Sequence, residues 1–299
     1  ASASGPTLLA ASHPPLLTPL FPLQTGIDFV QRENPYDDYA DQVLLPHKMS
    51  EQGPFLATGD VNGDGLEDIY FGAPSGQAGA LYLQDGNGKF RARKVPAFEQ
   101  DKEQEDAHPA FFDADGDGDL DLLVASGGYE FPENSPLYQP RLYLNDGNGN
   151  FQKAASALPP WPYSSSTVRP VDYDGDGDLD VFIGGLLTPK KYPLPGKSAL
   201  FLNDGMGRFR EITAQCCPEL SEIGMVKDAC GPTSTGTGAP TSCLPANGCP
   251  LPSCCKKTES WSTEPPSTFP SPWWDGGIAY GPPTWTGTAE RISLPATWV

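Results

Sequence analysis

Positive charge is scarce in this chain of 299 residues. It holds 19 lysines and arginines against 38 aspartates and glutamates, which gives a formal net charge of −19. A surface of this sign repels phosphate groups, so nucleic acid and anionic membrane surfaces are not expected as partners. Long apolar runs are missing too, since none reaches the roughly 18 residues that a transmembrane helix requires.

Histidine is also rare, and cysteine is absent from the first 215 residues. None of the three histidines, His13, His47 and His108, lies near a nucleophile motif such as G-x-S-x-G or a metal motif such as H-E-x-x-H. Each is therefore predicted to be a surface or loop residue. The sequence indicates no catalytic constellation, and the chain is not predicted to be an enzyme.

Glycine and proline, in contrast, are abundant, with 33 and 34 residues, which predicts many turns and little helix. Two motifs recur three times in the same order. The first is an acidic loop followed by an apolar run, as in DADGDGDLDLLVA from Asp113, with copies that start at Asp60 and Asp172. The second is an apolar strand followed by Asp-Gly, as in LYLNDGNGNF from Leu142, with copies from Leu81 and Leu200. Repetition of two strand signals at this spacing predicts a repeated multi-strand unit.

Each repeat is predicted to contain a buried strand and a hairpin. The short apolar runs at 69–72, 122–125 and 181–184 end in small residues, as buried strands do. Asp-Gly between two apolar segments is a strong hairpin signal. Radial repetition of such units gives a β-propeller, so the predicted fold class is all-β, with about three intact blades.

The acidic loops place negative charges side by side. Two carboxylates about 4 Å apart repel by roughly 4 kcal/mol at an effective dielectric constant of 20, so a bound cation is expected to hold them together. Side-chain oxygens occur at positions 1, 3, 5 and 9 of each loop, glycine occupies position 6, and the carbonyl at position 7 can complete the shell. This oxygen supply suits Ca²⁺, which takes about six to eight hard ligands, better than octahedral Mg²⁺. One ion per loop, three in all, is predicted. The predicted ligands are Asp60, Asn62, Asp64, Leu66 and Asp68; Asp113, Asp115, Asp117, Asp119 and Asp121; and Asp172, Asp174, Asp176, Asp178 and Asp180.

The pattern D-x-[DN]-x-D-G-x-x-D, followed by an apolar strand and Phe71-Gly-Ala-Pro74, resembles the FG-GAP/VCBS repeat of integrin α-type propellers. The order of segments from Gly26 to about Lys227 is similar to that of bacterial VCBS-repeat proteins related to cartilage acidic protein, the ASPIC/UnbV group. The resemblance implies a seven-bladed propeller with calcium in its blade loops and no established catalysis. It also implies export to the periplasm, the cell surface or the extracellular space.

Three intact loops are fewer than the roughly four blades that the smallest propellers need. Residues 26–230 are therefore predicted to form an incomplete set of blades. Residues 1–25 are interpreted as a leader or linker. They begin without Met or a basic region, so we expect either that a signal peptide is already removed or that the N-terminus is truncated. Residues 231–299 form an irregular tail rich in Cys, Pro and Trp.

The tail has two interpretations. It is either a disulfide-rich secreted module or a frame-shifted translation of further blades. The codons GAC-GGG-GAC-GGG encode Asp-Gly-Asp-Gly, and the same string started one base later encodes Thr-Gly-Thr-Gly. Such strings occur at 235–238 and, in part, at 286–289, which would place shifted acidic loops at 233 and 284, near the spacing of the first three. We favour the frame shift, in which case Cys243, Cys249, Cys254 and Cys255 were never selected as cysteines.

Two functions remain open from the sequence. The first is a calcium-stabilised, exported propeller that acts in adhesion or in recognition of an extracellular protein or carbohydrate. The second is a fragment of a propeller-type enzyme, such as a polysaccharide lyase or a phospholipase-associated domain, whose catalytic residues lie elsewhere. Trp161 and Tyr163, in LPPWPYSSS, are candidates for an exposed sugar- or protein-contacting loop.

Overall fold

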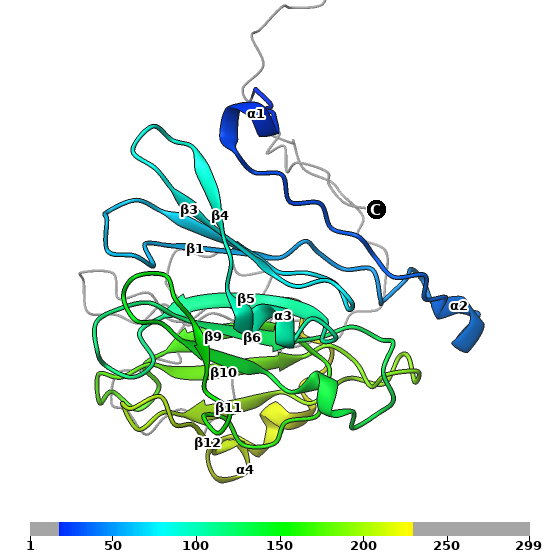
Figure 1. Ribbon diagram of the computed structural model, residues 1–299. Helices are drawn as coiled ribbons and strands as arrows, with labels where there is room; N and C mark the ends of the chain where they lie inside the picture. Colours follow the sequence, from blue (N-terminus) through cyan, green and yellow to red (C-terminus); the bar gives the residue numbers. More distant parts are fainter. Residues whose placement is uncertain (1–17, 230–299) are drawn as a thin grey trace, which may run out of the picture. The chain divides into compact units, whose positions relative to one another are not determined.

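Three four-stranded antiparallel sheets make up most of the computed structural model, which describes residues 18–229 (Figure 1). In each sheet the strands follow one another in chain order, so that every neighbour is joined by a hairpin or a loop. The first sheet contains β1 (Leu56–Gly59), β2 (Asp68–Phe71), β3 (Ala80–Gln84) and β4 (Phe90–Arg93). The second contains β5 (Asp106–Phe112), β6 (Asp121–Ser126), β7 (Arg141–Leu144) and β8 (Gln152–Lys153). The third contains β9 (Ser165–Val171), β10 (Asp180–Gly185), β11 (Ala199–Leu202) and β12 (Arg210–Glu211).

The three predicted apolar strands are the second strands of these sheets, and the prediction is confirmed. All six residues of β6 are buried, so both faces of this strand are covered. Side chains of successive strand residues point to opposite faces. Leu123 and Ala125 therefore join a core cluster shared with the third sheet, whereas Leu122 and Val124 join one shared with the first. The middle sheet is thus covered on both sides, which explains its continuous apolar run.

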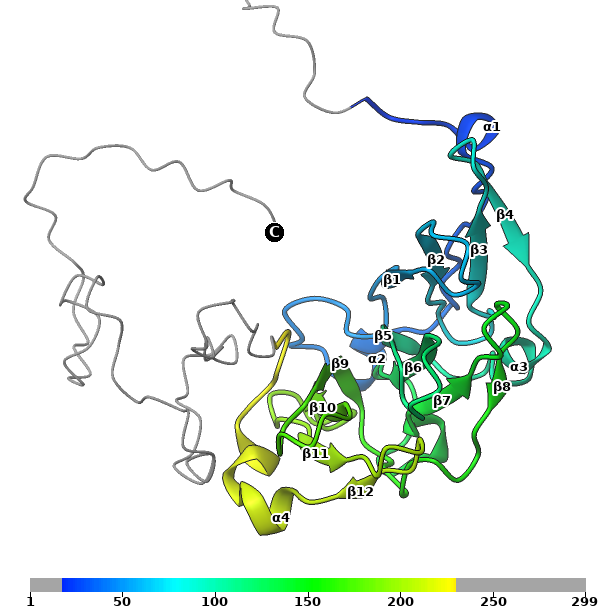
Figure 2. The same cartoon turned by 90° about the vertical axis from the view of Figure 1, so that its left-hand side faces the viewer.

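The predicted hairpins are confirmed, and they form the outer half of each sheet. β3, β7 and β11 pair with β4, β8 and β12 across the Asp-Gly turns. The inner strands of neighbouring sheets face one another, because β1 packs against β5, and β5 and β6 pack against β9. Figure 2 shows the sheets following one another in chain order around their inner strands. The described residues 18–229 therefore form three blades of an all-β, incomplete β-propeller.

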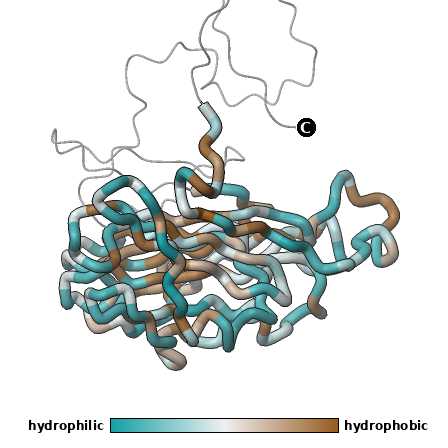
Figure 3. Tube along the Cα trace, turned by 45° about the horizontal axis from the view of Figure 1, so that its top comes forward, coloured by the Kyte–Doolittle hydropathy of each residue, from teal (hydrophilic) through white to brown (hydrophobic). Residues whose placement is uncertain are grey.

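Helices are few and short in the described part of the chain. They are α1 (Pro22–Thr25), α2 (Asp38–Asp41), α3 (Pro96–Gln100), α4 (Thr213–Cys216) and the 3₁₀ turns Pro136–Tyr138 and Pro218–Glu222. Within residues 18–229 no helix has the length and apolar character needed to cross a membrane. Figure 3 shows hydrophobic stretches mainly in the interior of the described part and hydrophilic stretches mainly at its edges.

The segment before the first strand packs on the blades. Phe29 stacks on Phe71 of β2 with ring centroids 5.1 Å apart, and the Tyr82 hydroxyl donates to Asp28 at 2.7 Å. Further along, Leu45 and Met49 are buried in a third cluster with Tyr129, Leu186 and Leu187, from loops of the second and third blades. The predicted tail at 231–299, its cysteines and shifted loops, and His13 lie outside the described residues.

Candidate metal centre

Each acidic loop joins the first strand of a blade to the second. The first acidic loop spans residues 60–68, the second 113–121 and the third 172–180. Because β1–β2, β5–β6 and β9–β10 occupy equivalent places in the three blades, the loops occur at the same end of each sheet. The three acidic loops, which occupy the same position in each sequence repeat, therefore also occupy the same position in each blade.

Glycine at position 6 allows a sharp turn in each acidic loop. Gly65, Gly118 and Gly177 have φ angles of 85°, 92° and 99°, a region that residues with a Cβ atom rarely adopt. The turn aims backbone N–H groups at the aspartate in position 1. In the second loop, Gly116 and Gly118 donate to the two carboxylate oxygens of Asp113 at 2.7 and 3.1 Å.

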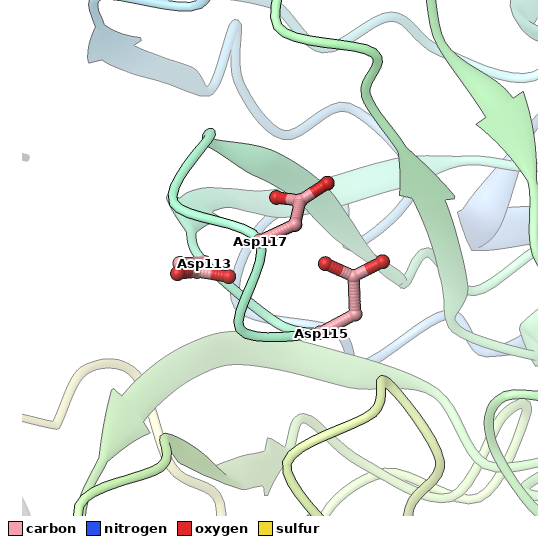
Figure 4. Close-up of side chains that lie close together, drawn as sticks. All are labelled: Asp113, Asp115 and Asp117. Atoms are coloured by element: carbon pink, nitrogen blue, oxygen red, sulfur yellow. The ribbon is translucent and has the colours of Figure 1, made fainter.

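Positions 1, 3 and 5 come together in two of the three loops. Asp113, Asp115 and Asp117 each offer a carboxylate oxygen within 4.8 Å of the other two, and their side chains gather around one loop in Figure 4. In the third loop the corresponding group is Asp172, Asp174 and Asp176. Three carboxylate oxygens this close together could bind a single divalent cation placed between them.

The first loop is arranged by hydrogen bonds around its asparagine. Asn62 Nδ2 donates to Asp64 Oδ2 at 3.1 Å, and Gly65 N donates to Asp60 Oδ2 at 2.8 Å. The amide at position 3 therefore occupies a place where the other loops have a carboxylate. This loop carries less negative charge at the predicted ligand positions than the other two.

The aspartates at position 9 lie apart from these clusters. Asp68, Asp121 and Asp180 are buried at the start of β2, β6 and β10, and each accepts two backbone N–H groups. In the second loop the donors are Ala114 N, at 3.0 Å, and Asn145 N, at 2.8 Å. Position 9 thus ties the loop to the hairpin of its own blade, and its role as a metal ligand stays a prediction.

Position 7 offers a side-chain carboxylate in two of the loops, in addition to the predicted backbone carbonyl. In the first loop it is Leu66, but in the other two it is Asp119 and Asp178. Oδ1 of each of these aspartates is shielded from solvent and has no hydrogen-bond partner, and so is Oδ1 of Asp115. Buried carboxylate oxygens without a donor are costly, and a bound cation would satisfy them. The second and third loops therefore fit a calcium ion at the carboxylates of positions 1, 3 and 5, and Asp119 and Asp178 are candidates for a further ligand.

Crowding of the carboxylates changes their ionisation. Burial, followed by repulsion from Asp117, raises the pKa of Asp119 to about 6. Burial and repulsion from Asp176 likewise raise the pKa of Asp178 to about 6, and burial raises that of Asp121 to about 7. These directions apply without a cation; a divalent charge in the loop would favour the ionised forms.

Two of the sequence predictions, for Trp161 with Tyr163 and for His108, are wrong. Trp161 is not exposed but buried against Phe201, with ring centroids 5.4 Å apart, and Tyr163 packs edge-on against it. His108 is not a loop residue but lies on β5, half-buried, 3.0 Å from Arg169 Nη1. Trp161 packs on β11 through Phe201, whereas His108 lies between Arg169 and Phe55, with the His108 and Phe55 ring centroids 6.3 Å apart. His47 is exposed in a loop, as predicted.

The sequence analysis also missed a role for two asparagines of the hairpin motif. Asn145 and Asn203 were interpreted only as part of the turn, yet each side chain reaches the acidic loop of the preceding blade. The available signal was that Asn recurs directly before Asp-Gly in the second and third repeats.

Comparison with known proteins agrees with this geometry. Residues 60–124 and 131–183 match the FG-GAP-like repeat. Residues 60–183 of the chain therefore carry FG-GAP-like repeats. The two matched FG-GAP segments contain all three acidic loops together with β2 to β5, most of β6, β7 to β9 and most of β10.

Among solved structures, the FG-GAP blades are similar to the Dos1 propeller, at 11% sequence identity and a TM-score of 0.35. The similarity covers 60% of this chain and 40% of that one, so the present chain spans less than half of that protein's length. No curated protein matches the sequence.

Proposed function

We propose that this protein is an exported, calcium-binding propeller in which calcium stabilises the blade loops and the blades recognise an extracellular protein or carbohydrate, for instance in adhesion. The observation that supports calcium most directly is the set of shielded, unpartnered oxygens on Asp115, Asp119 and Asp178. They occur in the same two loops whose carboxylates cluster within 4.8 Å.

The chemistry of the ligands favours calcium over other divalent ions. Every predicted donor is an oxygen atom, and no histidine or cysteine belongs to the clusters found among the described residues. Hard oxygen ligands suit both Ca²⁺ and Mg²⁺. Four carboxylates, each able to bind through one or two oxygens, and a carbonyl can supply the roughly six to eight oxygens that Ca²⁺ takes, whereas Mg²⁺ demands a strict octahedron. The larger and more tolerant ion is therefore the better fit.

A structural role follows from where the loops lie. The acidic loops connect the first and second strands, whereas the long loops 127–140 and 186–198 connect the second and third strands. In an antiparallel sheet these connections lie at opposite ends. The ions would thus stabilise one rim of the blades, and the longer loops at the other rim would be available for recognition.

The first test is thermal unfolding with and without a chelator. Calcium that binds only the folded loops stabilises by about 2.7 kcal/mol per site at a concentration 100 times Kd. For a domain of this size, removing one such ion should lower Tm by roughly 5–10 °C. Restoring Ca²⁺ should recover the loss, and the same concentration of Mg²⁺ should recover less. An unchanged Tm in excess chelator would rule out calcium in these loops.

The recognition role is tested separately. Calcium-loaded protein should be retained on one or more immobilised polysaccharides or extracellular-matrix proteins, with the ligand recovered intact. Turnover of a polysaccharide instead of retention would contradict a recognition role and favour the enzyme.

A further inference from the structure

The acidic loops of neighbouring blades are joined by hydrogen bonds. The connection begins within a blade, at the buried aspartate in position 9. Asp121 accepts from Asn145 N at 2.8 Å, and Asp180 accepts from Asn203 N at 2.8 Å. These two asparagines are the first residues of the hairpin turns, so each turn is fixed to the acidic loop of its own blade.

The side chains of the same asparagines then cross to the preceding blade. Asn145 Nδ2 donates to the Val61 carbonyl at 2.7 Å, and Asn203 Nδ2 donates to the Ala114 carbonyl at 2.8 Å. Val61 and Ala114 both occupy position 2 of an acidic loop, between the predicted ligands at positions 1 and 3. Both asparagines are buried, so water does not compete strongly for these bonds.

The peptide groups at position 2 close the connection. Val61 N donates to Asp68 at 3.1 Å, and Ala114 N donates to Asp121 at 3.0 Å. A continuous path therefore runs from Asp68 through Asn145 to Asp121, and from Asp121 through Asn203 to Asp180. Each step is a hydrogen bond or a single residue, and the pattern is the same at both blade junctions.

We propose that Asn145 and Asn203 are positioning residues that couple cation binding in neighbouring acidic loops. This inference rests on the proposed function, since it requires a cation in the loops. An ion that orders positions 1 and 3 of the second loop also fixes the Ala114 carbonyl between them. The carbonyl then holds Asn203, whose N–H group fixes Asp180 in the third loop. The first ion thus orders part of the neighbouring loop. The second ion then pays a smaller entropy cost on binding, so the two ions bind with positive cooperativity.

A purely local role of the asparagines can be separated from coupling by chemistry. Asn203 Oδ1 accepts from Asp204 N at 2.9 Å within its own turn, whereas only Nδ2 reaches the preceding blade. Asn203→Asp keeps an acceptor for the turn and removes Nδ2, which donates to Ala114 of the preceding blade and also to the Leu179 carbonyl of its own loop at 3.2 Å. An unchanged Ca²⁺ affinity of the third loop in this variant shows that the loss of the Leu179 bond does not account for the result. Met206→Asp adds the same charge to the same turn at an exposed side chain and serves as the matched control.

The experiment measures the Ca²⁺ affinity of the second loop by titration calorimetry on the full chain. The first loop is disabled throughout by Asp60→Asn with Asp64→Asn. The third loop is either intact or disabled by Asp172→Asn with Asp176→Asn. With native Asn203, disabling the third loop should weaken Ca²⁺ binding at the second loop about 5-fold or more. The control Met206→Asp should keep this ratio, and Asn203→Asp should reduce it to about 1.

The outcomes separate the two proposals. If the wild-type protein binds no Ca²⁺, both the proposed function and the coupling are overturned. If it binds Ca²⁺ but the affinity ratio is 1 with native Asn203, or survives Asn203→Asp, only the coupling is overturned. Should Asn203→Asp fail to fold, Asn145→Asp provides the same test for the first and second loops. Its control is Asn148→Asp, at an exposed position of the same turn.

Discussion

Arg141 and Asp106 form a buried ion pair, with Arg141 Nη2 2.6 Å from Asp106 Oδ1 and side chains only 3% and 4% exposed. Arg141 lies at the start of β7 and reaches Asp106 at the start of β5, two strands away in the same blade. The other oxygen of Asp106 accepts from the Tyr70 hydroxyl of the first blade at 2.9 Å. The pair therefore joins two blades at the end of the sheets opposite the acidic loops.

Arg141→Met should destabilise the protein by about 3–5 kcal/mol, because it leaves the Asp106 carboxylate buried without its counter-charge. The matched control is Arg208→Met, which breaks an exposed pair with Asp204 at 2.8 Å and should cost less than about 1 kcal/mol. Urea unfolding measures both values. Equal losses in the two variants would show that the buried pair has no special part in blade packing.

Asp115→Asn should have opposite effects with and without calcium. In excess chelator the variant should be more stable by about 1 kcal/mol, because one of several crowded carboxylates is neutralised. In calcium it should lose affinity about tenfold or more, because the charge of the ligand set decreases. Thermal unfolding and calcium titration give the two readouts. Glu103→Gln, which removes an exposed charge outside the loops, should change neither, and a loss of stability of Asp115→Asn in chelator would contradict the prediction.

Glu105 should make stability fall as pH rises. Its side chain is 2% exposed, Oε2 accepts from Ser75 N at 2.8 Å, and Oε1 has no hydrogen-bond partner. Burial, with a smaller contribution from Glu130, raises its pKa to about 9. The folded state thus keeps a proton that the unfolded chain releases above its ordinary pKa near 4.5. The stability contributed by this group is complete below pH 4.5 and is lost as pH rises to about 9.

Glu105→Gln removes this dependence and measures it. The wild-type free energy of unfolding, relative to that of the variant, should fall by up to about 1.4 kcal/mol per pH unit between pH 5 and 8. Urea unfolding across this range, at a fixed calcium concentration, gives the difference. Glu99→Gln, at an exposed residue of α3, is the control. Parallel profiles for wild type and Glu105→Gln would show that Glu105 is ionised in the folded protein.

The DNA that encodes residues 231–299 should contain the missing repeats in a neighbouring reading frame. We expect Asp-Gly-Asp-Gly codons that begin near positions 233 and 284, because the Thr-Gly strings there match a shift of one base. Sequencing this region and translating all frames is sufficient. If no frame encodes acidic loops, the tail is a cysteine-rich module in its own right.

Local patterns were enough to predict the blades. The apolar runs became β2, β6 and β10, and each Asp-Gly motif became a hairpin, because strand burial and turn type depend on a few neighbouring residues. The same holds for the loops, where glycine at position 6 and aspartates at alternating positions bring Asp113, Asp115 and Asp117 together. The predictions that failed concern residues whose neighbours come from strands distant in the sequence. Trp161 was predicted to be exposed because nothing near it in sequence reveals that Phe201 lies beside it.

The amino-acid sequence by itself determined the repeat, the buried strand and the hairpin of each blade, and the chemistry of the acidic loops. The strands, turns and loops are set by neighbouring residues, and the repeat shows because the same motifs recur along the chain. Only the tertiary structure decided which groups meet across blades. The contact of Asn145 with Val61 spans 84 residues, and that of Asn203 with Ala114 spans 89. Such contacts require two blades to pack before either partner finds the other, so no local pattern encodes them. Packing likewise buries Glu105 and Arg141 and thereby decides which charged groups control stability.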